Sequence, residues 1–276
     1  MIETGWVKNP NAPTPDGKEL IVGTPSSHVD SQHENQANEP KERNKPLLSI
    51  LIPTVYSREK KWKELVNALE AQQMALPMPD RVEIVTLKDN GEMMVGEKLN
   101  RLLEMAKGEY LCFFDDDDTP FGNYLVKIIE ALETRPDVVG ITIFWTDNIF
   151  DSVRLLIRSL DYQQYHWLVK SDAVTCGRPA HLNPTRSSIA KSVKFPENMT
   201  AGEDAAWSAI VAGKLKTCVN IDVPIYYYNF QKEGTITQRP GAREAMRAAL
   251  PEGHQYAMRD GKIVELDRHG VVVVKS

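Results

Sequence analysis

Four consecutive aspartates, Asp115–Asp118, follow the short apolar segment 108–114, and this junction constrains the fold more than any other part of the sequence. The segment is aromatic and is bounded by Gly108 and Pro120, which is typical of a buried strand. Adjacent carboxylates repel one another, so they need either water or a hard divalent cation that binds oxygen ligands. Ligands of open α/β sheets bind at the carboxyl ends of the strands. The run therefore indicates a metal–phosphate site, with a solvated acidic turn as the alternative.

Composition restricts the class of protein. With 276 residues, 42% of them hydrophobic, the chain has room for one large domain or two small ones with an ordinary core. A net charge of −5 gives no overall basic field for nucleic acid, although a local basic groove is compatible with it. Cys112, Cys176 and Cys218 are widely spaced and form no CxxC motif, as in reduced cytosolic proteins. No apolar stretch reaches membrane-spanning length. We expect a soluble cytoplasmic protein, located in the host cytoplasm if the source is viral.

Apolar strands alternate with amphipathic helices in the body of the chain. Strands are predicted over 47–54 (stopped by Pro53), 82–87, 108–114 and 138–144. Helices are predicted from Glu59, over 95–106 and over 124–132, each with apolar residues at three- and four-residue spacing. Strands that alternate with helices form a mostly parallel sheet with right-handed crossovers. The sequence therefore predicts an α/β fold with a nucleotide-binding sheet flanked by helices.

The later part of the chain is less regular. We expect a strand or short helix over 153–160, a short helix over 185–191, a helix after Asp204, and strands over 216–221 and 225–230. Residues 1–46 are rich in proline and polar residues and predict an extended arm or linker. Residues 239–276 predict a helix over 242–250 and small hairpins built from 256–258, 262–266 and 271–274, a small β appendage.

Polar residues at the predicted strand ends are the candidates for chemistry. Alternate carboxylates of an Asp-x-Asp turn can face one cation and the ribose or diphosphate beside it, which pairs Asp115 with Asp117 and leaves Asp116 with Asp118. Asp89 is either a generic turn residue or a carboxylate that accepts a hydrogen bond from a nucleobase. Thr54 likewise is either a helix cap or a nucleotide contact.

Glu203 and Asp204 stand where a loop enters a helix. Both acids favour a helix N-terminus, and one of them facing the substrate can instead act as a general base. His181, in the loop before, is a metal ligand, an acceptor contact or a hydrogen-bonded loop residue. Trp207 is either helix-face core or a stacking platform.

Taken together, these segments resemble glycosyltransferase family 2, the inverting enzymes with the GT-A fold. The likeness covers roughly residues 47–238, and its specificity lies in the order and spacing of the motifs. The segments that carry it are Ser49–Thr54, Val82–Leu87 with Asp89-Asn90-Gly91, Gly96-x-Lys98-Leu99-Asn100, Ala106–Leu111 leading into Phe114–Asp118, Phe195-Pro196 before Gly202-Glu203-Asp204, and Tyr226–Tyr228 before Thr235-Ile236-Thr237.

The resemblance implies transfer of a sugar from a nucleoside-diphosphate sugar, UDP-linked in our reading, to a hydroxyl with inversion. It places Asp115 and Asp117 on the ribose and on Mn²⁺ or Mg²⁺, and it makes Asp204 the catalytic base with Glu203 second. The predicted nucleotide contacts are Pro53, Thr54, Asp89, Lys98, Asp115 and Asp116. The predicted acceptor contacts are His181, Asn183, Arg186 and Trp207.

Departures from the family pattern leave some points open. Lys88-Asp89 stands where the family often has two acids, and no histidine follows Tyr228, so the third metal ligand is undefined. The lack of a Gln-x-x-Arg-Trp motif and of a membrane span argues against a processive polysaccharide synthase. The stretches 178–186 and 202–207 are similar to stand-alone members, several of them viral. Some phage transferases of this kind modify hydroxymethylated pyrimidines in DNA, so the expected acceptor is such a base, with a glycan or protein of a bacterial surface pathway as the alternative.

Two other classes of protein are compatible with a strand-end acidic cluster. A nucleotidyltransferase usually has a glycine-rich basic loop near its first strand, and Pro53-Thr54-Val55-Tyr56 offers none. A non-catalytic nucleotide-sugar-binding module is expected to have lost its acids, whereas both acidic clusters are present here.

Overall fold

A computed structural model describes residues 45–147, 152–171, 173–230, 255–259 and 262–266 of the chain. The chain divides into two units, Met1–Pro40 and Lys41–Ser276, and all described residues belong to the second. Residues 1–44 of the arm predicted over 1–46, the helix over 242–250, the strand over 271–274 and the Thr235–Thr237 segment lie outside the described residues.

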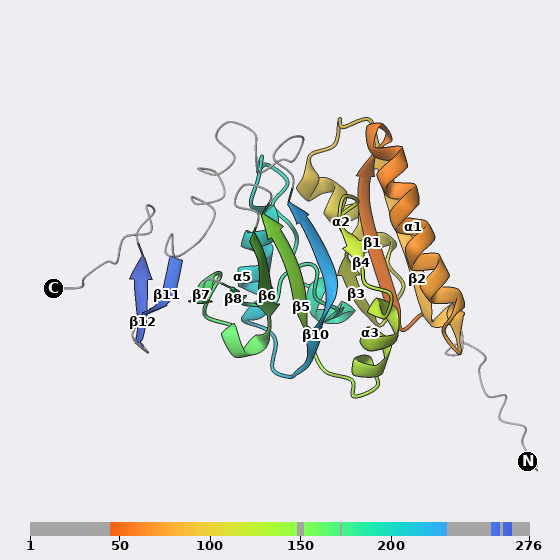
Figure 1. Cartoon of the computed structure of the whole chain (residues 1–276). Helices are drawn as coiled ribbons and strands as arrows, with labels where there is room; N and C mark the ends of the chain where they lie inside the picture. Colours follow the sequence, from red (N-terminus) through yellow and green to blue (C-terminus); the bar gives the residue numbers. More distant parts are fainter. Residues whose placement is uncertain (1–44, 148–151, 172, 231–254, 260–261, 267–276) are drawn as a thin grey trace, which may run out of the picture. The chain divides into compact units, whose positions relative to one another are not determined.

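Three parallel strands form the first part of the sheet. β1 (Leu48–Val55) lies between β2 (Val82–Asp89) and β3 (Tyr110–Phe113) and is parallel to both. Helices α1 (Glu59–Met74) and α2 (Val95–Met105) make the connections, which confirms the predicted strand–helix alternation (Figure 1). One boundary was wrong: β1 continues beyond Pro53 to Val55. Proline is tolerated there because β3 ends its pairing with β1 at Leu51, so no ladder hydrogen bond is lost.

The sheet continues through a short strand that bridges its two parts. β9 (Thr185–Arg186) is antiparallel to both β3 and β5 (Val138–Asp147), so β5 points the same way as β3. β10 (Cys218–Phe230) runs parallel to β5, and β4 (Thr119–Pro120) pairs with β10. The two strands predicted over 216–230 are one strand, because the ladder continues through a register shift at Pro224.

An extension with both parallel and antiparallel pairs completes the sheet. β6 (Ser152–Arg158) pairs with β5, so the 153–160 segment is a strand, and β8 (Val174–Gly177) and β7 (Leu168–Ser171) follow. The predicted hairpin at 256–266 is confirmed as β11 (Gln255–Arg259) and β12 (Lys262–Leu266), with β11 beside β7. Among the described residues the order is β12-β11-β7-β8-β6-β5-β9-β3-β1-β2, with β10 on β5.

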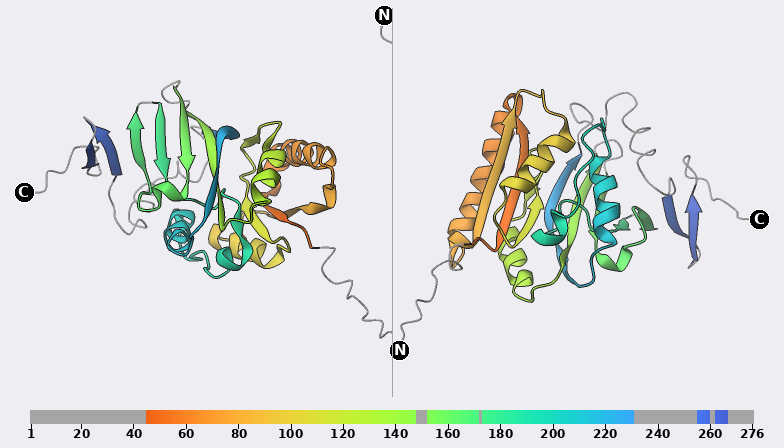
Figure 2. Two further views of the ribbon diagram at one scale, coloured as in Figure 1. Left: turned by 90° about the horizontal axis from the view of Figure 1, so that it is seen from below. Right: turned by 180° about the vertical axis from the view of Figure 1, so that it is seen from behind.

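Helices cover both faces of the sheet. α1 and α3 (Tyr124–Leu132) pack on one face with Ile50, Ile52 and Phe114. α2, α4 (Ser187–Ala190) and α5 (Glu203–Ala212) pack on the other, with Leu51 and Phe113 (Figure 2). The predicted helix over 185–191 is therefore shorter, because Thr185 and Arg186 belong to β9. Short 3₁₀ turns occupy Tyr56–Arg58, Pro79–Arg81 and Leu160–Tyr162. The described helices include none with the length and apolarity that a bilayer crossing requires.

Candidate functional site

The carboxyl ends of five strands meet at one edge of the sheet. β1, β2 and β3 are mutually parallel, so Thr54, Asp89 and the acidic run come to the same edge. β5 and β10 point in the same direction, and the backbone N–H of Asn229 near the end of β10 donates to Asp118 at 2.9 Å. The fold thus brings together the strand-end residues that the sequence singled out.

Two of the four aspartates are held inside the protein. Asp116, 4% exposed, accepts hydrogen bonds from the Thr54 hydroxyl and from Arg58 Nη1, both at 2.6 Å. Asp118, 6% exposed, accepts from the Tyr226 hydroxyl at 2.5 Å in addition to the Asn229 amide. Burial, followed by the nearby Asp115 charge, raises the pKa of Asp118 well above its ordinary range. These two carboxylates anchor the run to β1 and β10, and Asp116, which was predicted to contact the nucleotide, accepts hydrogen bonds from Thr54 and Arg58.

The other two aspartates remain accessible. The side chain of Asp115 is 34% exposed and that of Asp117 is 14% exposed. A turn closed by a hydrogen bond from Asp118 N to Asp115 O, at 3.2 Å, carries both. Burial and the charge of Asp115 raise the pKa of Asp117, although Arg58 Nη1 at 3.5 Å acts in the opposite direction. The run is therefore divided into an anchored pair, Asp116 and Asp118, and an accessible pair, Asp115 and Asp117.

The accessible pair suits a hard divalent cation. Mg²⁺ and related ions are commonly held by one or two carboxylates together with phosphate oxygens of the substrate. Within the described residues, no group of three or more His, Cys, Asp or Glu side chains is arranged to hold a metal. Two accessible carboxylates, one with a pKa raised by its neighbours, fit an ion whose remaining ligands come from a bound diphosphate.

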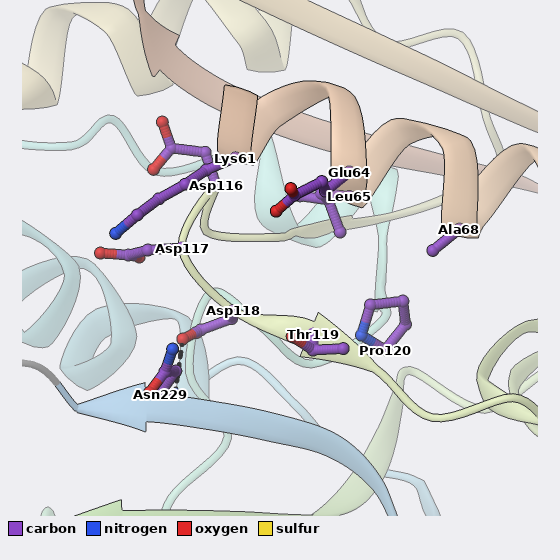
Figure 3. Close-up of a pocket in the computed structure, with 10 residues that line it drawn as sticks. All are labelled: Lys61, Glu64, Leu65, Ala68, Asp116, Asp117, Asp118, Thr119, Pro120 and Asn229. Carbon is purple, nitrogen blue, oxygen red and sulfur yellow. Dashed lines mark hydrogen bonds between the residues drawn. The ribbon is translucent and has the colours of Figure 1, made fainter. Parts of the chain in front are cut away.

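A pocket of about 330 Å³ lies between α1 and the acidic run. Lys61 of α1 points toward Asp117 across this pocket, and Asp118 meets Asn229 at its floor (Figure 3). Lys61 also lowers the pKa of Asp117, against the larger effect of burial. The pocket shows that the run is open on the α1 side as well as toward α5.

Asp89 and Lys98 form a buried ion pair at the end of β2. Lys98 Nζ, on α2, donates to Asp89 Oδ1 and to the Thr54 carbonyl oxygen at 2.8 Å. The Met93 amide donates to the other carboxylate oxygen at 2.9 Å. Burial would raise the pKa of Asp89, but the Lys98 and Met93 hydrogen bonds outweigh it and lower the pKa. Lys98 therefore stabilises the ends of β1 and β2, and its ammonium group donates hydrogen bonds to Thr54 and Asp89 of the protein itself.

The second acidic cluster starts α5. Gly202 adopts φ 87° immediately before the helix, a conformation that favours glycine. Glu203 is 8% exposed, its Oε2 atom has no hydrogen-bond partner among the described residues, and burial followed by the Asp204 charge raises its pKa to about 7. The Asp204 side chain is 36% exposed. The accessible acid of this cluster is Asp204.

His181 lies between the two acidic clusters. Its Nε2 is 3.8 Å from Asp115 Oδ1, and its Nδ1 is 3.7 Å from Asp204 Oδ2. Burial lowers the pKa of His181, but Asp115, Asp204 and Glu203 together raise it above its ordinary value. Of the four predicted acceptor contacts, His181 alone is brought next to Asp204.

The other three predicted acceptor contacts, Asn183, Trp207 and Arg186, are engaged in contacts within the fold. Asn183 is 1% exposed and donates to the carbonyl oxygens of Val139 and Arg158. Trp207 is 1% exposed and stacks on Phe195, with ring centroids 4.8 Å apart. Arg186 pairs with Tyr110 at the amino end of β3, the opposite end from the acidic run. A loop position or a residue type does not reveal burial, and the acceptor contacts at these three positions remain predictions.

Three residues of the site were missed from the sequence. Arg58 and Tyr226 donate hydrogen bonds to the anchored pair. The only sequence signal for either residue was the position of Tyr226 in a run of three tyrosines. Arg158, 7% exposed, stacks over Trp167 at 4.6 Å and donates to the His166 carbonyl oxygen at 2.9 Å. Burial lowers the pKa of Arg158 to about 10, and nearby Asp204 acts against this. Arg158 therefore supplies positive charge beside Asp204.

Comparison with known proteins identifies the architecture. Residues 63–181 match the model of glycosyl transferase family 2. TarS from S. aureus, residues 1–349 in complex with UDP-GlcNAc, shares 17% identity at a TM-score of 0.52 over 73% of this chain and 65% of that one. The mannosyltransferase PcManGT from Pyrobaculum calidifontis, in complex with GDP-Man and Mn²⁺, shares 13% identity at a TM-score of 0.48 over 74% of this chain and 64% of that one. The chain thus spans slightly less than two thirds of either neighbour. No curated protein sequence matches it.

The family match lies on the part of the chain that contains β2, β3, the acidic run and His181. The likeness to TarS shows that the mostly parallel sheet with helices on both faces is a GT-A fold. Residues 63–181, less than half of the chain, therefore resemble glycosyl transferase family 2, and the sheet that carries them has the GT-A fold.

Proposed function

We propose that this protein is a metal-dependent inverting transferase that moves a sugar from a UDP-sugar to an acceptor hydroxyl. The observation that carries the proposal is the division of the acids: an accessible pair, Asp115 and Asp117, faces an accessible carboxylate, Asp204, across His181. TarS, which has the same fold, binds UDP-GlcNAc, and UDP-sugars are therefore the first donors to test.

The donor binds along the strand ends. Pro53, Thr54 and Asp89 lie at the ends of β1 and β2 and border the nucleobase side, and Asp115 takes the ribose. Asp117, with Asp115, holds Mn²⁺ or Mg²⁺. When bound, the cation neutralises the charge that develops on the departing diphosphate. Arg58 holds Asp116 and Tyr226 holds Asp118, so the anchored pair stays in place while the accessible pair exchanges its ligands.

Asp204 acts as the general base. The acceptor oxygen forms a bond to the anomeric carbon as the bond from that carbon to the diphosphate oxygen breaks, and the hydroxyl proton passes to Asp204. Because the acceptor attacks the face opposite the leaving group, the anomeric configuration inverts. Glu203 is buried behind Asp204 and contributes to the local charge without contacting the acceptor.

The charge near the base favours an anionic acceptor. Arg158 is buried close to Asp204, and among the described residues it forms no ion pair with a carboxylate. A phosphate next to the reacting hydroxyl would complement this charge. Hydroxymethylated pyrimidine in DNA meets that description and is our first acceptor, with glycans and proteins of a bacterial surface pathway as alternatives. The thiols Cys112, Cys176 and Cys218 are free, as expected for a cytoplasmic enzyme.

A donor and acceptor panel tests the proposal. Purified protein is incubated with labelled UDP-, GDP- and dTDP-sugars, with hydroxymethylated DNA, protein extract or lipid-linked glycan, in Mn²⁺, Mg²⁺ or excess chelator. Release of UDP and labelling of one acceptor, only with a divalent ion, is the expected result. Release of sugar 1-phosphate, with transfer of the nucleoside monophosphate to the acceptor, would identify a nucleotidyltransferase. Binding of the donor without any turnover would identify a binding module.

A further inference from the structure

His181 is held on a rigid support between the two acidic clusters. The Phe113 amide donates to the His181 carbonyl oxygen at 2.9 Å, which fixes the residue to the end of β3. The Asn183 side chain closes the same loop by accepting from the Ala180 amide at 2.8 Å and donating to Val139 O at 2.9 Å. The imidazole is 12% exposed and packs against the Phe113 ring, with centroids 5.9 Å apart. Its position is therefore determined by the sheet.

The imidazole faces Asp204 with a nitrogen that has no hydrogen-bond partner. Nδ1 of His181 is buried and unbonded among the described residues, and Asp204 Oδ2 is 3.7 Å away. That separation is too long for a hydrogen bond, and a buried polar atom without a partner is costly. Catalytic hydrogen bonds are often long without substrate and shorten when it binds. Asp204 is the more exposed of the two groups, so its side chain is the one free to close the gap.

We propose that His181 is a positioning residue that donates a hydrogen bond from Nδ1 to Asp204 and so directs the other carboxylate oxygen at the acceptor hydroxyl. The Nε2 edge of the same ring faces Asp115 at 3.8 Å, which fixes the base relative to the donor site. The inference rests on the proposed function and extends it, because it moves His181 from the acceptor contacts to the orientation of the base. A base that is oriented by a third group is a general arrangement in nucleophilic catalysis.

Two substitutions separate the two sides of the ring. In His181→Asn, the amide nitrogen replaces Nδ1, on the Asp204 side, whereas in His181→Gln it replaces Nε2, on the Asp115 side. His181→Leu removes both donors and keeps the apolar packing on Phe113. All three are compared with Asp204→Asn and with His181→Leu/Asp204→Asn, on the donor and acceptor pair that the wild type uses in the panel.

We expect His181→Leu and His181→Gln to lower kcat by about 10- to 100-fold, with the donor KM within about twofold, whereas His181→Asn stays within about fivefold of wild-type kcat. Adding His181→Leu to Asp204→Asn should cause little further loss, since His181 acts only through the Asp204 carboxylate. UDP binding by calorimetry and a thermal melt of each variant show whether the fold is intact. If His181→Leu does not fold, the comparison of His181→Asn with His181→Gln still tests the proposal, because these two side chains differ by one methylene.

The proposal is overturned if His181→Asn is as impaired as His181→Gln, or if the loss lies in the donor KM. It is also overturned if the effects of His181→Leu and Asp204→Asn multiply. These outcomes differ from failure of the proposed function, which would appear as a wild-type protein that turns over no nucleotide-sugar.

Discussion

The acidic run after β3 contains two buried and two accessible carboxylates, and the acidic pair at the start of α5 contains one of each, but the two clusters stabilise their buried carboxylates differently. Asp116 and Asp118 accept four hydrogen bonds from Thr54, Arg58, Tyr226 and the Asn229 amide. Glu203 is equally buried, yet its Oε2 atom has no partner among the described residues.

This difference shows that the buried carboxylates of the two clusters have different structural roles. A buried carboxylate that accepts several hydrogen bonds fixes the backbone of its loop, and here it holds Asp115 and Asp117 at defined positions. A buried carboxylate with one oxygen left unpartnered, as in Glu203, costs stability in its charged form and is found mainly where function requires it. The acidic run after β3 is therefore built on satisfied hydrogen bonds, and the acidic pair of α5 retains one buried oxygen without a partner among the described residues.

The largest effect is expected at the accessible acid of α5. Asp204→Asn removes the general base, so transfer should fall by about 10²- to 10⁴-fold while UDP binding is retained. Steady-state turnover and calorimetry on the same preparation test this. Glu203→Gln is the matched control and should lose less than about tenfold; a larger loss there, with Asp204→Asn active, would make Glu203 the base.

The accessible pair of the run is tested next. Asp117→Asn should lower turnover by about 10²- to 10³-fold, and excess chelator should reduce the wild type to a similar level, because both remove the cation that stabilises the leaving group. Asp222→Asn changes an exposed acid of β10 outside the site and should leave turnover unchanged. Full activity of Asp117→Asn in chelator would contradict metal dependence.

Substitutions in the anchored pair should lower the free energy of unfolding. Asp118→Ala leaves the Tyr226 hydroxyl and the Asn229 amide without their acceptor and should lower the free energy of unfolding by about 2 to 4 kcal/mol. Urea denaturation followed by fluorescence measures the change. Asp115→Ala, at an accessible position of the same run, should lower it by less than about 1 kcal/mol. Equal losses would show that the two pairs are not distinct.

The smallest expected effect is a pH dependence of the free energy of unfolding that is due to Glu203, the buried acid of α5. The pKa of Glu203 is raised from 4.5 to about 7, so the folded protein binds this proton more tightly than the unfolded chain. The stability that it contributes is complete below pH 4.5 and is lost as the pH rises through 7. Glu203→Gln does not titrate, so its advantage over wild type should grow from pH 5 to pH 8, to at most about 3 kcal/mol.

Thermal melts of wild type and Glu203→Gln across that pH range make the measurement. Glu104→Gln, at an exposed position of α2, controls for the loss of one surface charge. A Glu203→Gln protein that is less stable than wild type at pH 8 would indicate that the glutamate has a partner when charged.

Much of the fold could be predicted because its signals are local. The β1–α1–β2–α2–β3 order follows from alternating apolar strands and amphipathic helices, and the spacing of Asp115 and Asp117 was enough to pair them. The 153–160 strand, the single β10 and the short β9 could not be predicted, because each is defined by pairing with a strand distant in sequence. For the same reason the burial of Asn183 could not be predicted, and the sequence left Trp207 open between helix-face core and a stacking platform.

The sequence by itself determined that acids lie at the ends of parallel strands and that a second acidic pair opens a later helix, because periodicity and turn chemistry act over a few residues. Only the tertiary structure decided how these acids differ. Arg58, Tyr226 and Asn229 reach Asp116 and Asp118 from segments separated by 58 to 111 residues, and His181 is placed between Asp115 and Asp204 by its hydrogen bond to β3. Burial and hydrogen-bond partners depend on packing between distant segments, and that packing assigns different roles to four identical side chains.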